Sequence, residues 1–157
     1  MENARIVRAA TDGKRCASLT ALAAGQERRH TARAFVLATG GILGGGVELA
    51  PGSVRESVFK LDIPVPPDVT RWSEPEIFGS HVFSRLGVRV DGEMRPRDDA
   101  GQTCWDNVFF AGRSVGGYDF ATEKSGHGVA LATGWQAGRM AAATAGKSGE
   151  PASGEQL

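Results

Sequence analysis

Two segments of this chain share one design, in which an apolar run stops at a pair of glycines. They are residues 35–41, Phe-Val-Leu-Ala-Thr-Gly-Gly, and residues 108–117, Val-Phe-Phe-Ala-Gly-Arg-Ser-Val-Gly-Gly. Short unbroken apolar runs are typical of strands buried on both faces, as in the parallel sheet of an α/β protein. Ligands of such sheets bind beyond the carboxyl ends of the strands, where glycine leaves backbone N–H groups uncovered. Together the two segments predict an α/β fold with a ligand site at these strand ends.

A third segment, residues 123–134, leads through closely spaced glycines into a predicted helix that runs from Gly128 to about Thr144. The first N–H groups of a helix have no partner inside it and carry about half a positive charge, so they stabilise an anion or an electron-rich carbonyl. The alternative is a plain N-terminal cap. Because Ala130 and Gly134 are small, the helix can approach a sheet closely, and we expect most of its surface to be covered.

The other predicted elements follow from turn residues and hydrophobic alternation. Asp12 and Gly13 supply the positive backbone angle of a tight turn and predict a hairpin. Ser73, followed by Glu-Pro-Glu, has the capping hydroxyl, early proline and acidic first turn of a helix. The expected elements are strands at 6–10, 16–23 and 30–39, a loop at 44–52, an extended connector at 63–67, a helix from 73 to about 86, and a short hairpin around Asp91 and Gly92.

Composition limits the kinds of partner. The 157 residues are enough for one domain with a buried core, and 18 basic residues balance 18 acidic ones. With no net charge, bulk electrostatics favours neither nucleic acid nor an anionic membrane as a partner. Cys16 and Cys104 are far apart and form no Cys-x-x-Cys, so we expect neither a metal site nor a disulfide framework. No apolar run is long enough to span a membrane, and we expect a soluble chain in a reducing cytoplasm.

The order of these pieces resembles a known superfamily. A hairpin, an Ala-Thr-Gly-Gly strand end, a variable insert, an Asn-x-Phe-x-Ala-Gly strand and a Gly-x-Gly helix start follow one another between residues 3 and 144. This order is similar to that in the C-terminal half of flavoproteins of the fumarate reductase and glutathione reductase type. The resemblance implies a Rossmann-like, three-layer FAD/NAD(P)-binding α/β fold. This chain would hold its β-meander, a small insert, and the closing strand and helix.

Within that superfamily, four stretches resemble the family formed by the B subunit of anaerobic glycerol-3-phosphate dehydrogenase. They are residues 39–46, 54–65, 87–96 and 116–134. The resemblance implies oxidation of sn-glycerol 3-phosphate to dihydroxyacetone phosphate, with electrons leaving through FAD or FMN toward membrane quinone. It also implies two partners, the A subunit (a flavoprotein) and the C subunit (an iron–sulfur protein), and contact with the inner membrane only through a partner. Two alternatives stay open: another fumarate reductase-like flavin oxidoreductase, or a non-catalytic subunit-docking module.

The resemblance assigns roles to three groups of residues. Arg113 stands where the superfamily often has an acidic residue, which leaves a phosphate or an acidic partner open for its side chain. His127 is the candidate proton carrier because an imidazole titrates near neutral pH, and a structural histidine is the alternative. By position, Thr39, Gly40 and Gly41 would lie near the dinucleotide or phosphate end of the cofactor. Gly112 and Arg113 would lie along its ribityl chain. The residues that would lie against the flavin ring are Gly126, His127, Gly128 and Val129.

One motif of the superfamily is absent from these residues. The sequence Gly-x-Gly-x-x-Gly, which holds the pyrophosphate of the cofactor at a helix start, does not occur. We therefore expect a fragment that binds flavin weakly by itself and is inactive alone. The expected domain is the C-terminal part of a flavin-binding domain at residues 1–146, with a reduced substrate-side insert at 47–86, followed by a flexible tail at 147–157.

Overall fold

The computed structural model describes residues 4–147, which form three small sheets, three 3₁₀ helices and one long α-helix. The first sheet is antiparallel and consists of β1 (Ala4–Asp12), β2 (Arg15–Ala23) and β3 (Gln26–His30), in that order. Gly13 turns the chain between β1 and β2 with a φ of +53°, so the predicted hairpin is confirmed.

The strand predicted at residues 30–39 is wrong in its extent, because two strands share that region. β3 ends at His30, and β4 (Phe35–Leu37) belongs to a different sheet. In that second sheet Phe35 lies opposite Val108 of β7 (Val108–Phe110), and the two strands are parallel. The side chains of β3 are all exposed and mostly charged, so no hydrophobic alternation marks this strand in the sequence.

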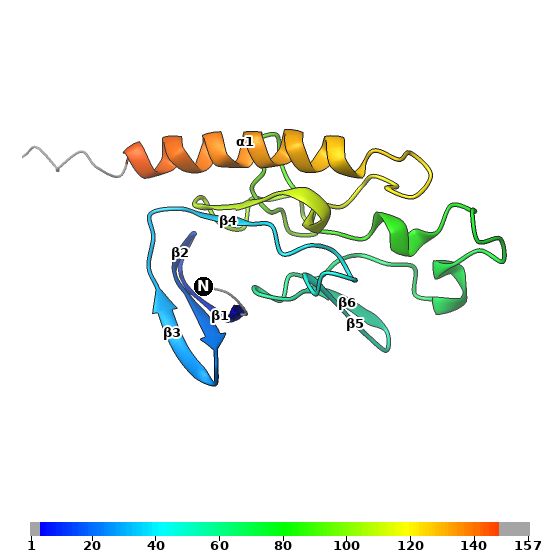
Figure 1. Ribbon diagram of the computed structural model, residues 1–157, viewed down its shortest axis with the longest axis horizontal. Coiled ribbons are helices and arrows are strands. Elements are labelled where there is room, and N and C mark those ends of the chain that lie inside the picture. Colours follow the sequence, from blue (N-terminus) through cyan, green and yellow to red (C-terminus); the bar gives the residue numbers. More distant parts are fainter. Residues whose placement is uncertain (1–3, 148–157) are drawn as a thin grey trace, which may run out of the picture.

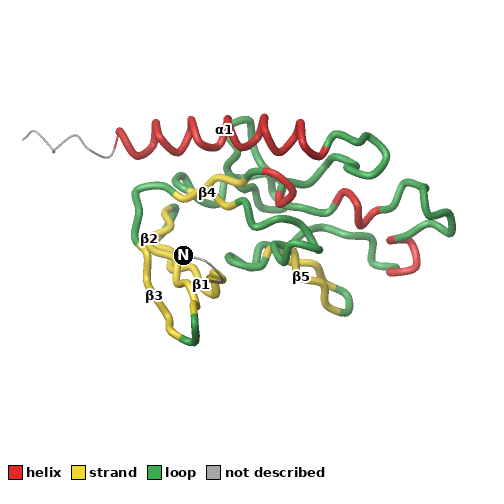
Figure 2. Tube along the Cα trace, in the orientation of Figure 1, coloured by secondary structure: helices red, strands yellow, loops and turns green. Residues whose placement is uncertain are grey.

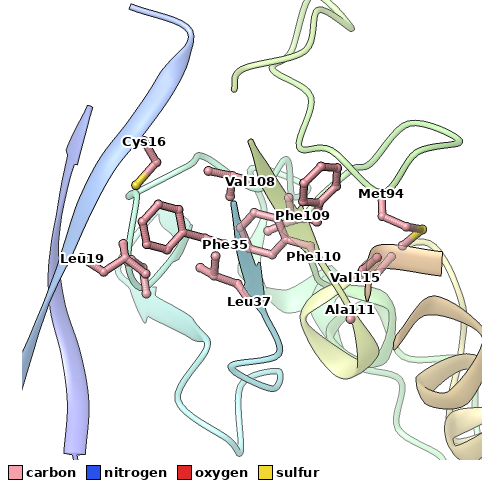
Figure 3. Close-up of a cluster of buried hydrophobic side chains, with 13 residues drawn as sticks. Cys16, Leu19, Phe35, Leu37, Met94, Val108, Phe109, Phe110, Ala111 and Val115 are labelled. Carbon is pink, nitrogen blue, oxygen red and sulfur yellow. The ribbon is translucent and has the colours of Figure 1, made fainter. Parts of the chain in front are cut away.

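The parallel pair lies between the antiparallel sheet and α1 (Gly126–Lys147), so that the elements form three tiers (Figure 1). α1 packs across one face of β4 and β7, while irregular segments fill much of the opposite side (Figure 2). Figure 3 shows the ring of Phe35 between Cys16 of β2 and Phe110 of β7. These side chains belong to one buried cluster, which extends to Ala137 of α1. The core therefore holds the parallel strands in a fixed place beneath the helix.

Residues 47–56 are a hairpin and not the loop predicted at 44–52. β5 (Val47–Ala50) and β6 (Ser53–Glu56) pair in antiparallel fashion around Gly52, whose φ is +76°. The Glu56 carboxylate is fully buried and accepts hydrogen bonds from the N–H groups of Val58 and Phe59 at 2.8 and 2.6 Å. Burial raises the pKa of Glu56 in spite of these bonds.

The helix predicted from Ser73 to about Leu86 is wrong. Two short 3₁₀ helices, η1 (Val69–Trp72) and η2 (Val82–Arg85), stand at the two sides of an irregular segment. Ile77 and Phe78 are 84% and 94% exposed, so this segment has no buried apolar face to stabilise a helix. His81 organises it instead: Nδ1 accepts from the Glu74 N–H at 3.0 Å, and Nε2 lies 3.0 Å from the Ile77 carbonyl.

The predicted hairpin around Asp91 and Gly92 is a tight turn with isolated bridges and no regular strands. Asp91 Oδ1 accepts from the N–H groups of Glu93 and Arg95, and a bridge joins Val90 to Pro96. Hydrogen bonds from Arg95 outweigh burial and lower the pKa of Asp91. The Asp91 carboxylate thus stabilises this turn in place of the ladder of backbone hydrogen bonds expected between two strands.

α1 is the one long helix among the described residues, and it is much less covered than the sequence predicts. Leu131 is 77% exposed and Trp135 64% exposed, while Ala137 is fully buried. The helix therefore packs with one stripe only. None of the helices in the described range is long and apolar enough to cross a membrane. The predicted tail, apart from Lys147, lies outside the described residues.

Candidate functional site

The carboxyl ends of β4 and β7 lie side by side because the two strands run parallel in register. The Ala111 N–H donates to the Leu37 carbonyl at 2.9 Å, which continues the pairing to the last residue before the glycines. A Cβ at Gly41 would stand 2.9 Å from Cγ of Arg113, so the chain after β4 touches the chain after β7. The two glycine-ended segments of the sequence thus meet at one edge of the sheet.

The start of α1 packs against the turn that follows β7. This turn is η3 (Gly112–Ser114), and the Gly112 N–H donates to Oγ1 of Thr133 at 2.8 Å. The same hydroxyl donates to the Val129 carbonyl at 2.6 Å, which fixes its acceptor lone pairs toward Gly112. In Figure 1 the turn lies directly beneath the amber N-terminal end of α1. The structure therefore brings all three glycine-rich segments to one region.

The first turn of α1 offers bare backbone donors. Its first helical hydrogen bond runs from the Val129 N–H to the Ser125 carbonyl at 2.9 Å. Within residues 4–147, the N–H groups of Gly126, His127 and Gly128 have no hydrogen-bond acceptor. A Cβ built at Gly128 would meet nothing within 4 Å, so open space adjoins this backbone. Such an end can hold an anion or a polarised carbonyl.

The Arg113 side chain is engaged inside the protein. Its guanidinium donates to the carbonyls of Ser84 and Leu86 at 2.6 and 3.2 Å, and it stacks over the Phe120 ring at 4.3 Å from the centroid. Arg113 therefore binds two backbone oxygens, where the sequence left a phosphate or an acidic group open as its partner. Gly41 is required beside this arginine because any side chain there would collide with it.

A small apolar hollow of about 140 Å³ lies between the chain after β4 and the aromatic residues near Arg113. Leu43 at its rim is 99% exposed, and Phe83 is 39% exposed. The lining is suited to the edge of a flat, apolar ring. The lining residues are Gly41, Ile42, Leu43, Gly44, Phe83, Arg113 and Phe120.

Two buried hydroxyl groups near the strand ends have no hydrogen-bond partner in the described part of the chain: Oγ1 of Thr39 and the hydroxyl of Tyr118. Buried hydroxyls are nearly always paired with protein, water or ligand. Thr39 follows β4 by two residues, and Tyr118 lies under the Arg113 guanidinium. With the bare amides of α1 and the apolar hollow, these groups suit a ligand that has both an aromatic ring and polar substituents. A flavin dinucleotide is such a ligand, so the residues present fit the group that the sequence implies.

Asp119 orders the loop that precedes α1. Burial opposes ionisation of its carboxyl, but the hydroxyls of Ser84 and Thr122 and nearby amides outweigh that effect and lower the pKa to about 2. Oδ1 accepts from the N–H groups of Ala121 and Thr122 at 3.1 and 3.2 Å, and Oδ2 lies 3.5 Å from Nε of Arg85. The carboxylate therefore holds the loop before α1 against η2.

His127 lies in the first turn of α1 with an exposed side chain. It makes no hydrogen bond to another described residue, so nothing in the fold requires it as a structural histidine. Residues 4–147 hold no group of three or more His, Cys, Asp or Glu side chains that could bind a metal ion together.

Comparison with known proteins identifies the class to which this arrangement belongs. The family model described as FAD binding domain matches residues 11–129, and the chain belongs to this family. The fold is accordingly an FAD-binding α/β fold.

The curated relatives are more specific. The chain is 43% identical over 113 residues to the probable B subunit of anaerobic glycerol-3-phosphate dehydrogenase from Halobacterium salinarum, and the match covers 72% of this chain and 26% of the relative. It is 32% identical over 123 residues to the B subunit of anaerobic glycerol-3-phosphate dehydrogenase from Vibrio cholerae, covering 77% of this chain and 28% of the relative. The resemblance to the B subunit is thereby confirmed.

The chain spans about a quarter of the length of these relatives. No solved structure matches it significantly.

Proposed function

We propose that the chain forms the flavin-facing part of an FAD-dependent oxidoreductase, the B subunit of an anaerobic glycerol-3-phosphate dehydrogenase. The substrate would be sn-glycerol 3-phosphate and the product dihydroxyacetone phosphate. The observation that carries the proposal is the meeting of three glycine-rich segments, two strand ends and the start of α1, beside unpaired backbone donors. The names of the relatives supply the substrate class, and the family supplies FAD in preference to FMN.

Different residues would contact different parts of the cofactor. FAD held by these residues would supply the acceptor for a hydride from the hydroxyl-bearing carbon of the substrate. The N–H groups of Gly126, His127 and Gly128 would face the electron-rich N1 and C2 carbonyl region, where negative charge develops on reduction. His127, whose imidazole is exposed beside these amides, would take the hydroxyl proton. η3 would follow the ribityl chain, and residues 39–41 would lie near the phosphates.

The chain would work within a larger assembly. Its relatives are named as one subunit of a dehydrogenase, which supports partner subunits for this chain. We propose the flavoprotein A subunit and the iron–sulfur C subunit, with electrons passing to quinone and with the complex on the cytoplasmic side of the inner membrane. Because residues 4–147 lack a Gly-x-Gly-x-x-Gly motif, we expect weak flavin binding by this chain alone.

FAD titration of the purified chain, followed by visible absorption and flavin fluorescence, tests the proposal. We expect weak, saturable binding that the Gly128→Asp variant loses, because a carboxylate would occupy the place of the flavin carbonyl. An acidic residue in the first turn stabilises a helix, so this loss would not result from unfolding. Gly138→Asp is the matched control, since Gly138 is also exposed on α1 but is ten residues away. Saturable binding that is equal in both variants would refute the proposed flavin position.

Exposed apolar side chains on α1 favour a second candidate, a non-catalytic docking module. Leu131 and Trp135 would be covered by another polypeptide in such a role. The titration separates the two candidates, because a docking module takes up no flavin at any concentration.

A further inference from the structure

An open hollow of about 620 Å³ lies beside the strand-end region, between residues 85–90 and the loop at 97–101. Its volume is within the usual range for small-molecule sites. Gly87 and Gly116 line it where two chain segments cross at backbone contact. A Cβ at Gly87 would stand 2.4 Å from the Gly116 nitrogen, so neither position tolerates a side chain. The hollow thus has a wall of bare backbone that is set by close packing.

Three arginines, Arg85, Arg89 and Arg97, line the same hollow. Arg89 and Arg97 are neighbours across a backbone hydrogen bond of 2.8 Å, from the Arg97 N–H to the Arg89 carbonyl. The Arg97 guanidinium has neither an ion pair nor a hydrogen bond with any described residue. The planar donor fork of arginine matches the oxygens of a phosphate group. The hollow is therefore lined by side chains whose donors suit an anion, above all the unpaired guanidinium of Arg97.

The carboxylates that face these arginines compete only weakly. Asp99 lies 3.8 Å from Arg89, and the two side chains are 71% and 53% exposed, so this pair contributes little. Asp98 also lines the hollow, but its Oδ1 accepts from the Gln102 N–H at 2.8 Å and closes its own loop. Arg85 shares its charge with buried Asp119 at 3.5 Å. Asp98, Asp99 and Asp119 together balance the three guanidinium groups, so a phosphate would have to displace the weakly held Asp99 from Arg89.

Hydrogen bonds join the chain that lines the hollow to the chain that follows β7 in the proposed flavin region. Arg113 donates to the carbonyls of Ser84 and Leu86, the two neighbours of Arg85 in the sequence. The Gly117 N–H donates to the Arg85 carbonyl at 3.1 Å. The chain that leaves β7 therefore forms the strand-end turn and then a wall of the hollow.

We infer that this hollow binds the phosphate group of a small phosphomonoester. The anion site rests on the arginines that line the hollow. Its assignment to the phosphate of a three-carbon substrate rests on the proposed function. The phosphate would be held by Arg89 and Arg97, with Arg85 at the side nearer the strand ends.

Amide NMR spectra of the full chain, titrated at constant ionic strength, test the inference. We expect saturable shifts of the Gly101, Gly116 and Gly117 amides with inorganic phosphate and with sn-glycerol 3-phosphate, and none with glycerol. The double variant Arg89→Gln/Arg97→Gln should weaken both affinities at least tenfold. Arg28→Gln, which removes an exposed arginine of β3 outside the hollow, should leave them unchanged. The spectra themselves report whether each variant is folded.

Two results would overturn the inference: no saturable shift with either phosphate compound, or shifts of equal affinity in the double variant. Saturation by ADP without saturation by glycerol 3-phosphate would also overturn it, because the hollow would then serve a pyrophosphate. The titration contains no flavin, so its result is independent of the FAD experiment. Failure of FAD uptake with intact phosphate binding would reject the flavin proposal alone.

Discussion

The side chain of Asn107 pairs with the backbone of Cys16 as a neighbouring strand would. Its Oδ1 accepts from the Cys16 N–H at 2.7 Å, and its Nδ2 donates to the Cys16 carbonyl at 2.9 Å. A third bond runs from Nδ2 to the Arg33 carbonyl at 3.2 Å. Since Asn107 immediately precedes β7 and is 1% exposed, one buried amide joins the antiparallel sheet to the parallel pair.

Asn107→Ala should lower the free energy of unfolding by about 3 kcal/mol, because it leaves buried N–H and carbonyl groups of the backbone without partners. Urea denaturation followed by circular dichroism would measure the change. Gln26→Ala, at an exposed position of β3, is the control and should shift stability by less than about 0.5 kcal/mol. An unchanged urea midpoint for Asn107→Ala would show that the two sheets do not depend on this amide.

Gly87→Ala should destabilise the chain by about 2 kcal/mol or more, because the added methyl would press on backbone that cannot rotate away. The colliding atoms are the Gly116 nitrogen at 2.4 Å and the Val115 carbonyl carbon at 2.6 Å. Gly92→Ala is a close match in the same segment, since its Cβ would meet nothing within 4 Å. Thermal melts of the two variants should therefore differ clearly, and similar melting temperatures would contradict the close crossing at Gly87.

The elements that were predictable from sequence are those with a local cause. The apolar runs at β4 and β7 and the small-residue helix α1 all carry their pattern in adjacent residues. The hairpin β5–β6 was missed because its outer face is exposed and polar, and its buried face consists of few side chains. The helix predicted from Ser73 rested on a capping hydroxyl and an acidic first turn. Such a start signal cannot supply the apolar face that stabilises a helix.

The meeting of the glycine-rich segments was predictable from the sequence, and the side-chain contacts around them were not. The glycine-rich segments predicted to meet do meet, but the N–H groups of Gly112 and Gly117 after β7 are paired inside the fold, while the amides at the start of α1 are unpaired within residues 4–147. The partners of Arg113 and the buried position of Asp119 depend on residues 80–86, which have no regular pattern in the sequence. The exposure of Leu131 and Trp135 could not be predicted either, because an apolar helix position does not specify which segment covers it.

Asp119 should give the chain a component of acid sensitivity. Its pKa falls from the ordinary 3.8 to about 2 on folding, so the ionised carboxylate stabilises the folded state. That contribution is complete above about pH 4 and disappears as the pH falls toward 2. Asp119→Asn cannot ionise, so the difference in unfolding free energy between wild type and variant should shrink over this interval. Urea titrations at pH 6, 4 and 2.5 would measure it, and a difference that is constant with pH would contradict the assigned shift.

Thr133 offers the most direct test of how α1 positions the turn after β7. Its hydroxyl accepts from the Gly112 N–H at 2.8 Å and is itself oriented by the Val129 carbonyl at 2.6 Å. Thr133→Val keeps the shape of the side chain but leaves the Gly112 N–H without its acceptor, which should cost about 1–2 kcal/mol of stability. Because Gly112 would then be free to rotate away from the start of α1, the affinity for FAD should also fall several-fold. Thr20→Val on β2 is the matched control, since Thr20 makes no side-chain hydrogen bond to a described residue. Loss of stability with unchanged FAD affinity would place Gly112 outside the cofactor site, and no change in either would mean that the hydroxyl does not position the turn.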